Sequence, residues 1–271
     1  MIVTKLFASG ASPEATAAWF WTVAGGAGSY PRDLEEAVLW VLPLAVVKMP
    51  RLRVHDVSVR LRGYGVRLSG GPDRRLRGCL VAYGGKGCVV LDGTDPANEQ
   101  RFSLAHEVAH FLVEYLQPRH QALAALGEGL LSVLDGERSP SVEERVHGVL
   151  AAVPIGVHVH MMDRRAAEDG ASTVEEAESG ADRLALELLA PRRDVRRRLL
   201  GSGPHAGEAE EIEVAVRLLS QEFGLPVSVA ASYARQIVLS SRPAQPFREW
   251  LGMARHQCRT SGCGAELEIE R

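Results

Sequence analysis

The sequence lacks the features that mark membrane, exported and nucleic-acid-binding proteins. Its formal net charge is −3 over 271 residues, so no excess of positive charge draws it toward nucleic acid or acidic lipid. The most apolar N-terminal stretch, residues 15–29, is too short and too rich in glycine to span a bilayer. The residues before it do not form an export signal, because polar residues, Pro13 and Glu14 interrupt the apolar run. We therefore expect a cytoplasmic protein with no membrane association and no direct nucleic-acid partner.

Lysine and cysteine are both scarce. The chain has three lysines, while its other strongly basic residues are arginines, which indicates coding bias in a GC-rich genome rather than a chemical role. Among the four cysteines, Cys79 and Cys88 lie in two expected strands. If Tyr83 pairs with Cys88, Cys79 lies about 13 Å further along, whereas the Cα atoms of a disulfide lie within about 7 Å of each other. We therefore expect reduced thiols there, in agreement with a cytoplasmic protein.

The other two cysteines, Cys258 and Cys263, lie in the segment CRTSGC near the C-terminus. Together with His256 they offer three metal-binding groups. The spacing between the two cysteines does not match that of a usual zinc knuckle. We therefore favour free thiols near a frayed terminus over a metal site here.

Hydropathy patterns predict a mainly helical protein with its clearest strands near the middle of the chain. Asp33–Leu42 has an acidic first turn and apolar residues at helical spacing, which predicts a helix. Two apolar segments joined at Gly84–Gly87 predict a β-hairpin. Asp95 as an N-cap and Pro96 at the first helical position then begin a helix that should end by Pro118.

The remaining segments predict further helices and two short strands. The β-rich segments are LAVVKM, at residues 44–49, and VPIGVHVHMM, at residues 153–162. A long insertion lies between the helix that follows the hairpin and the later helices. In this insertion Ser141 and Glu144 offer a capping box. Capped or amphipathic helices are expected near residues 172–190, 209–223 and 227–239.

The segment FSLAHEVAHFLVEYL (Phe102–Leu116) places ionisable groups in an otherwise apolar helix. Residues four apart lie on one face of an α-helix, so His106 and His110 can direct both imidazoles at one point. Glu107 is displaced from His106 by about 100° around the helix axis. From there it can reach a water bound to the same ion more easily than it can reach the ion itself. Two nitrogen ligands with a neighbouring carboxylate are what an HExxH metallopeptidase requires.

The alternative is a chance match, with an incidental histidine pair on a partly buried helix. An HExxH pattern arises by chance in roughly a few per cent of chains of this kind. Ionisable groups on an apolar helix must find partners or cost several kcal/mol, and one metal ion satisfies the three groups of this motif together. We therefore favour a metal site.

A third protein ligand should come from later in the chain. A further histidine on the same helix, as in metzincins, is excluded because Val113 and Leu116 occupy the required positions. The common remaining ligand is a carboxylate from another helix. Glu178 and Asp182 lie four residues apart on one helix face, so we expect Glu178 to bind the metal and Asp182 to support a ligand ring, that of His106. Acidic residues are also common near helix starts, but Asp182 lies too far along the helix for that explanation.

With these residues identified, the chain resembles the ImmA/IrrE family of metallo-endopeptidases. In that family a β-hairpin leads into an RFxxAHExxH helix, and the third zinc ligand is the glutamate of an ExxA(N/D)xFAxxLLxP helix. RFSLAHEVAHFL and ESGADRLALELLAP match these segments, with Leu184 in place of the usual phenylalanine. The resemblance covers roughly residues 77–191 and is weaker in LLSQEFGLPVSVAASYARQIV. The insertion between the two matching helices is longer than is typical of the family.

The resemblance implies a zincin-like α+β fold, in which a small antiparallel sheet packs on the HExxH helix and the rest is mainly helical. It implies one Zn²⁺ bound by His106, His110 and Glu178, with Glu107 as the catalytic residue. The implied substrate is a protein, often a DNA-binding helix-turn-helix repressor that is cleaved in stress response or mobile-element control. We expect three parts along the chain. Residues 1–76 form a mostly helical N-terminal segment packed on the core, and residues 77–200 form the metallopeptidase core with a helical insertion at about 119–172. Residues 201–271 form a helical C-terminal segment with a polar tail.

Peptide hydrolysis also needs a donor, besides the metal, for the developing oxyanion. His158 and His160 point the same way if their segment is a strand, because side chains on a strand repeat every two residues. We take His160 as the candidate donor, and Tyr115 and Tyr233 as alternatives. The plainer interpretation is a half-buried strand with exposed histidines.

Two other functions stay open at this point. The first is a non-enzymatic regulatory or binding protein that keeps the zincin fold and the metal site. Glu107 argues against it, because a purely structural site has no use for a carboxylate beside its first ligand. The second is a zinc hydrolase that acts on a small molecule, which the residues do not exclude.

Overall fold

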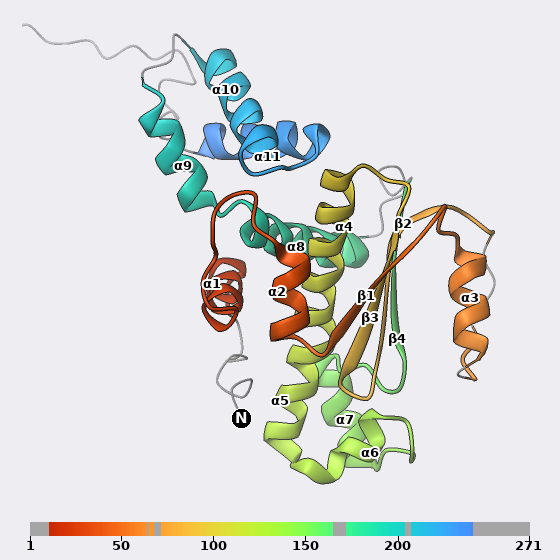
Figure 1. The fold of residues 1–271 in the computed structure, drawn as a ribbon. Helices are drawn as coiled ribbons and strands as arrows, with labels where there is room; N and C mark the ends of the chain where they lie inside the picture. Colours follow the sequence, from red (N-terminus) through yellow and green to blue (C-terminus); the bar gives the residue numbers. More distant parts are fainter. Residues whose placement is uncertain (1–10, 64, 68–71, 165–171, 204–206, 241–271) are drawn as a thin grey trace, which may run out of the picture.

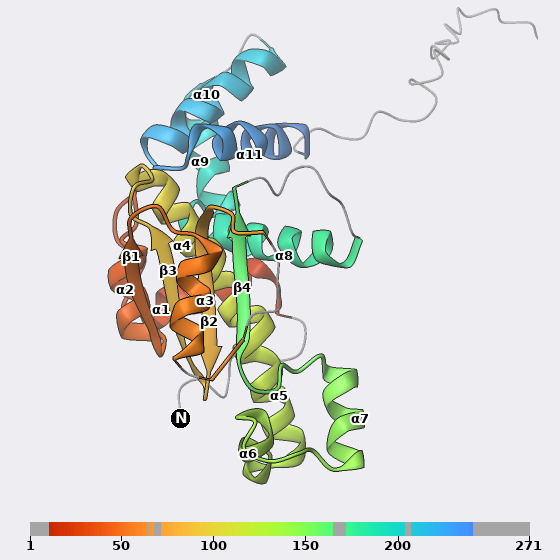
Figure 2. The same ribbon diagram turned by 90° about the vertical axis from the view of Figure 1, so that its right-hand side faces the viewer.

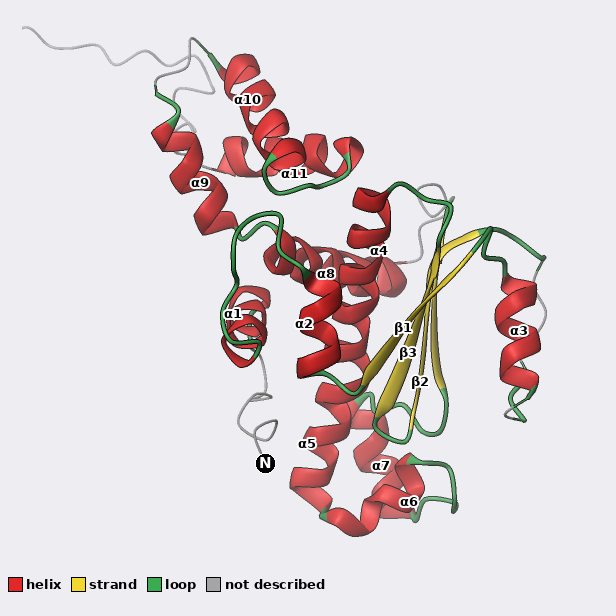
Figure 3. Ribbon diagram, viewed as in Figure 1, coloured by secondary structure: helices red, strands yellow, loops and turns green. Residues whose placement is uncertain are grey.

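The computed structural model describes residues 11–63, 65–67, 72–164, 172–203 and 207–240. Within these ranges the side chains of residues 147, 149–151 and 172–178 lie outside the description. The strands of the described part are β1 (Leu44–Met49), β2 (Leu76–Tyr83), β3 (Lys86–Asp92) and β4 (His158–Asp163). Its α-helices are α1 (Pro13–Val23), α2 (Leu34–Val41), α3 (Val54–Arg62), α4 (Ala97–His110), α5 (Gln117–Leu126), α6 (Leu131–Leu134), α7 (Val142–Ala151), α8 (Ser172–Leu189), α9 (Arg192–Gly201), α10 (Glu208–Gln221) and α11 (Val227–Ser240). The α+β class is confirmed, with a small sheet packed on the HExxH helix α4 and helices around it (Figure 1, Figure 3).

The sheet is mixed, whereas we expected an antiparallel one. Its strand order is β1-β3-β2-β4, in which β2 pairs antiparallel with both β3 and β4, and β1 pairs parallel with β3. The hairpin turn makes β2 and β3 antiparallel, but between β1 and its partner β3 the chain passes through α3 and β2. Such a crossover connection permits parallel pairing. β1 and β4 are the two edge strands (Figure 2).

The two faces of the sheet contribute to different hydrophobic cores. Leu80, Ala82 and Val89 belong to the main core, together with side chains of α2 and α4. Cys79 and Val90 belong to a second core with side chains of α3. This alternation follows from the two-residue period of a strand. α3 therefore covers one face of the sheet and α4 lies on the other (Figure 1).

The hairpin turn contains fewer residues than the turn implied by a pairing of Tyr83 with Cys88. Gly84 and Gly85 both have positive φ, +58° and +75°, as a two-residue hairpin turn requires. Tyr83 therefore pairs with Lys86, and Cys88 pairs with Val81. Cys79 thus lies two residues along β2 from the partner of Cys88 rather than four, and both cysteines are free thiols.

Helix α4 begins one residue later than predicted, and helical structure continues beyond it past the predicted end at Pro118. Pro96 is its N-cap rather than its first helical residue, and the Asp95 carboxylate pairs with Arg164 instead of capping the helix. The chain runs from α4 through a π-helical segment, Phe111–Leu116, into α5 without leaving helical geometry. Pro118 is tolerated because it lies in the first turn of α5, where a missing N–H costs little.

The long insertion contains α5, a 3-10 turn at Glu128–Leu130, α6 and α7, and it forms a small core of its own. The predicted capping box at the start of α7 is confirmed. The Glu144 amide lies 3.2 Å from Ser141 Oγ, and the Ser141 amide lies 2.7 Å from Glu144 Oε2. The insertion returns to the sheet through β4 (Figure 2).

The later helices complete the main core. α8 packs against α1 and α4, while α10 packs against α9 and α11. Within the described residues, no helix combines the length and the apolar character needed to cross a bilayer. The segment with Cys258, Cys263 and His256 lies outside the described residues.

Candidate metal centre

The three residues of the HExxH motif are buried on α4. His106 is 2 % exposed, Glu107 0 % and His110 1 %. The Nε2 atoms of His106 and His110 lie 3.1 Å apart. Two nitrogens that share a tetrahedral zinc at bond lengths of about 2.0–2.1 Å lie roughly 3.3 Å apart. The histidine pair is therefore placed as two ligands of one ion would be.

Asp182 of α8 lies against the first of these histidines. His106 Nδ1 is 2.9 Å from Asp182 Oδ1, across the packed helices α4 and α8. With Nδ1–H donating to the carboxylate, the His106 Nε2 lone pair faces His110. A carboxylate on the second ring nitrogen is the usual support of a metal-binding histidine. Asp182 is half exposed, so this support lies at the edge of solvent.

Glu114 supports the second histidine, although we did not single it out from the sequence. His110 Nδ1 lies 2.8 Å from Glu114 Oε1, and Glu114 is in the π-helical segment. Burial raises the pKa of Glu114, but the contact with His110 and the nearby His160 and His158 together outweigh it, so the pKa lies below its ordinary value. The spacing of four residues between His110 and Glu114 was a usable signal, because residues four apart on a helix face each other.

β4 brings two further histidines to the same face of α4. His158 and His160 point the same way, as the two-residue period of a strand predicts. His160 Nδ1 lies 2.9 Å from Glu107 Oε2. His158 Nε2 lies 3.8 Å from Glu114 Oε2. Burial lowers the pKa of His158, which favours its neutral form.

His106, His110 and His160 offer ring nitrogens that all lie within 4.8 Å of one another, so this cluster could hold a metal ion. The rings do not take equivalent positions. His106 and His110 meet edge to face, at 4.7 Å between centroids and 64° between planes. His160 stacks on His110, at 3.6 Å and 17°. In nearly parallel stacked rings the in-plane lone pairs run side by side instead of converging, so His106 and His110 fit a shared ion better than His110 and His160 do.

Glu107 has one carboxylate oxygen engaged with His160 and the other beside Gly78 of β2. Its Oε2 is the partner of His160, whereas Oε1 is buried without a hydrogen-bond partner among the described residues. Gly78 of β2 leaves room for this oxygen, because a Cβ there would lie 3.2 Å from Oε1. A buried carboxylate oxygen without a donor is costly unless a ligand or water uses it. The residues present therefore fit a metal-activated hydrolytic site.

The other candidate residues are placed differently. Glu178 lies in α8, but its side chain is outside the described residues. The Tyr115 hydroxyl accepts the Gly85 amide at 2.8 Å, and the Tyr233 hydroxyl donates to the carbonyl of Ala190 at 3.3 Å. Both phenols thus contact backbone groups that are not part of the histidine cluster.

A cavity of about 400 Å³ opens beside Asp182. Side chains of α4, α8 and α11 line it, with Phe102 and Leu186 among the apolar ones and Ser228 and Ser232 among the polar ones. Because Asp182 touches both the cavity and His106, the cavity adjoins the histidine cluster.

The buried HExxH helix beside a small sheet, with a carboxylate at the second nitrogen of each motif histidine, agrees with the expected zincin-like fold. Residues 55–127 match the model of a peptidase family described as the IrrE N-terminal-like domain, which confirms the resemblance to the ImmA/IrrE family. The match supports a peptidase and covers α3, the hairpin, α4 and α5, whereas β4 and α8 lie beyond it. Comparisons with curated proteins and with solved structures found no significant match.

Proposed function

We propose that the protein is a zinc-dependent endopeptidase. The observation that carries the proposal is the buried pair of His106 and His110, with Nε2 atoms 3.1 Å apart and Glu107 beside them. His106, His110 and Glu178 would hold one Zn²⁺. The family match, which covers α4, supports a peptidase.

Bound zinc supplies a Lewis acid that makes water a stronger acid and polarises a peptide carbonyl. In the proposed reaction Glu107 accepts a proton from the attacking water at Oε1 and delivers it to the leaving amide nitrogen. Asp182 holds the ring of His106, and Glu114 holds that of His110, each by its Nδ1 atom. His160 touches Glu107 and is the proposed donor to the developing oxyanion.

The proposed substrate is a DNA-binding protein of the helix-turn-helix class. This part rests on the family resemblance, because no described residue by itself selects such a substrate. The cavity beside Asp182 could accept a substrate side chain next to the cleaved bond. Cleavage of a repressor would place the protein in stress response or mobile-element control.

The test uses purified protein, a panel of recombinant helix-turn-helix repressors, and labelled casein as a general substrate. The unmodified protein should cleave at least one of them, and a chelator should stop the reaction. Glu107→Gln should keep its zinc and lose about 10²–10⁴-fold in rate, because only the proton acceptor is removed. Glu143→Gln, an exposed change of the same chemistry on α7, is the control and should leave the rate unchanged. A Glu107→Gln rate within about tenfold of the parent would remove Glu107 from this role and favour the non-enzymatic alternative.

A further inference from the structure

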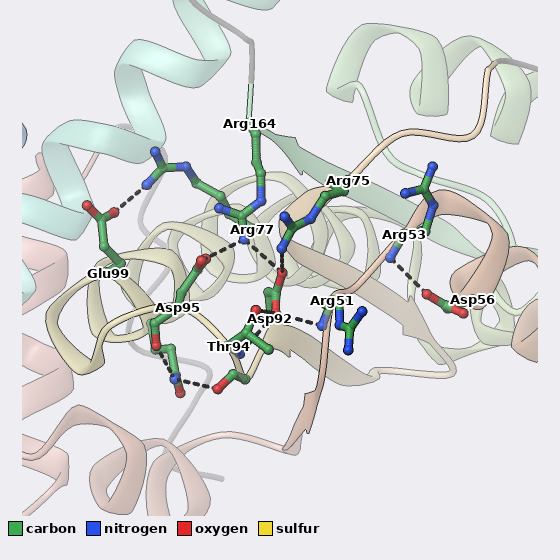
Figure 4. Close-up of polar contacts among 12 residues, drawn as sticks. Arg51, Arg53, Asp56, Arg75, Arg77, Asp92, Thr94, Asp95, Glu99 and Arg164 are labelled. Carbon is green, nitrogen blue, oxygen red and sulfur yellow. Dashed lines mark hydrogen bonds and ion pairs between the residues drawn. The ribbon is translucent and has the colours of Figure 1, made fainter.

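A cluster of ion pairs joins the end of β4 to the connection that leads into α4 (Figure 4). Asp92 ends β3, and its side chain is fully buried. Its Oδ2 accepts hydrogen bonds from Arg164 Nη2 at 2.8 Å and Arg75 Nη2 at 3.3 Å. The same Arg164 nitrogen lies 2.6 Å from Asp95 Oδ1. Arg164, the residue after β4, thus bridges two carboxylates on the chain between β3 and α4.

Asp92 is itself fixed through its other oxygen. Oδ1 accepts the Arg51 amide at 2.9 Å, the Thr94 amide at 3.0 Å and the Thr94 hydroxyl at 2.6 Å. Burial raises the pKa of Asp92, but these hydrogen bonds and the one from Arg164 outweigh it, so the pKa lies well below its ordinary value. The carboxylate therefore stays charged at neutral pH and offers Arg164 a rigid partner.

β4 needs such an anchor more than the other strands do. In the described part of the chain it is an edge strand paired with β2 alone, and it closes a long insertion. The pairing is also irregular at its end: Leu76 faces Asp163, but Gly78 faces Met162, so Arg77 is an extra residue on β2. Arg77 pairs with Glu99 on the first turn of α4 (Figure 4). Backbone pairing alone therefore specifies the register of β4 poorly at this point.

The register of β4 matters because of His160. A slip of one residue turns every side chain of a strand to the opposite face. His160 would then leave Glu107 and point toward the core beneath α3. Asp163 also pairs with Arg74, at 2.5 Å, but both side chains are partly exposed, and exposed ion pairs contribute little to stability. The bridge through Arg164 is less exposed, because it ends on the fully buried Asp92 and on Asp95, which is 10 % exposed.

We propose that Arg164 is a positioning residue, which fixes the register of β4 through Asp92 and Asp95 and thereby holds His160 against Glu107. Its role in holding the strand is independent of the reaction. Its effect on rate rests on the function proposed above. Arg164 lies four residues after His160 and joins the strand that carries His160 to the connection before the helix that carries Glu107.

The first test needs no activity. Hydrogen exchange of the β4 amides, residues 158–163, is measured in the parent and in Arg164→Gln, Arg164→Lys and Arg74→Gln. Arg164→Gln should lower protection of β4 about tenfold or more while α4 stays protected, because only the strand end is released. Lysine should restore part of this protection, since a point charge can meet one carboxylate at a time. Arg74→Gln should change little. Parent-like protection of β4 in Arg164→Gln would overturn the proposal.

The second test separates positioning from general stability. Arg164→Gln should lower kcat about 10- to 100-fold, with a small change in KM, because His160 and Glu107 lose their alignment. In a His160→Ala background the same change should cost almost nothing more. Losses that multiply would show that Arg164 acts independently of His160, and would overturn its positioning role.

Two outcomes need separate handling. If Arg164→Gln does not fold, Asp95→Asn removes one of the two partners of Arg164 and leaves Asp92 in place, and the same measurements decide on it. If the parent cleaves no substrate, the proposed endopeptidase fails, whereas the exchange experiment still decides whether Arg164 holds β4.

Discussion

Carboxylates occupy the second nitrogen of each imidazole in the histidine cluster. Asp182 lies against His106, Glu114 against His110, and Glu107 against His160. Each carboxylate fixes the orientation of its ring. Two of these pairs join residues far apart in the chain, so they also fix α8 and β4 relative to α4.

At the scale of single residues, zinc affinity should distinguish ligand from support. Asp182→Ala and Glu114→Ala should each weaken zinc binding about 10- to 100-fold, because the ligand rings lose their orientation. Glu178→Ala should weaken it much further, because a ligand is lost. Competition with a fluorescent zinc chelator measures all three variants. A larger loss for Asp182→Ala than for Glu178→Ala would show that the two roles are exchanged.

At the scale of elements, the hairpin depends on one close approach to β1 and to the π-helical segment after α4. A Cβ added at Gly87 would lie 2.5 Å from Leu44 Cδ1 and 2.8 Å from Phe111 Cε2. Both neighbours are buried side chains, so they have little room to move.

Gly87→Ala should therefore lower the free energy of unfolding by about 1–3 kcal/mol, the usual cost of overpacking. Gly148→Ala is the matched control, because Gly148 lies inside α7 with no heavy atom within 4 Å of its added Cβ. That change should be neutral or stabilise by about 0.5–1 kcal/mol. Urea unfolding measures both, and equal effects would contradict the packing described for the hairpin.

The ion cluster at the end of β4 makes a prediction about acid. The pKa of Asp92 is lowered in the folded protein, with Arg75 and Arg164 facing its carboxylate and Asp95 sharing Arg164. Its contribution to stability is therefore fully present above the unfolded pKa of about 3.9 and is lost as pH falls through the folded pKa.

Asp92→Asn tests this directly. The difference in unfolding free energy between Asp92→Asn and the parent should be constant from about pH 5 to 8 and should shrink below about pH 4. Urea unfolding across this range measures it. A difference that grows as the pH falls would mean that the carboxylate destabilises the fold, against the contacts described for it.

At the scale of the whole molecule, one hydrophobic core contains residues from all three parts that we expected along the chain. Buried side chains of α1, α2, α4, α8, α10 and α11 belong to the same cluster. The division at residues 76 and 200 stays a prediction. α8 takes part in this core and also carries the proposed ligand Glu178, so zinc would connect α8 to α4.

Removal of zinc should therefore lower thermal stability. With free zinc about 1,000-fold above its Kd, binding stabilises the folded state by about 4 kcal/mol, which corresponds to a rise in Tm of roughly 10 °C for a chain of this size. Metal analysis should find about one equivalent of zinc in the purified protein, and Tm should fall with chelator and recover with zinc. A folded, metal-free preparation whose Tm does not change when zinc is added would refute the site.

Local patterns explain which elements were predictable. The capping box of Ser141 and Glu144, the helix that carries His106, and the common direction of His158 and His160 each depend on residues within four positions of one another. The register of the hairpin was wrong because the length of its turn was left open by four residues that include three glycines. The end predicted at Pro118 was wrong because the π-helical segment before it leads directly into α5, where this proline lies in the first turn.

The sequence by itself determined that two histidines and a glutamate share one helix, because helical spacing is a property of neighbouring residues. Only the tertiary structure decided which residues of other elements contact these three. His160 reaches Glu107 from a strand more than fifty residues away, and Arg164 holds that strand through Asp92 and Asp95. The parallel placement of β1 was decided in the same way. Such contacts depend on the order and register of strands, which packing between distant segments fixes and no local pattern encodes.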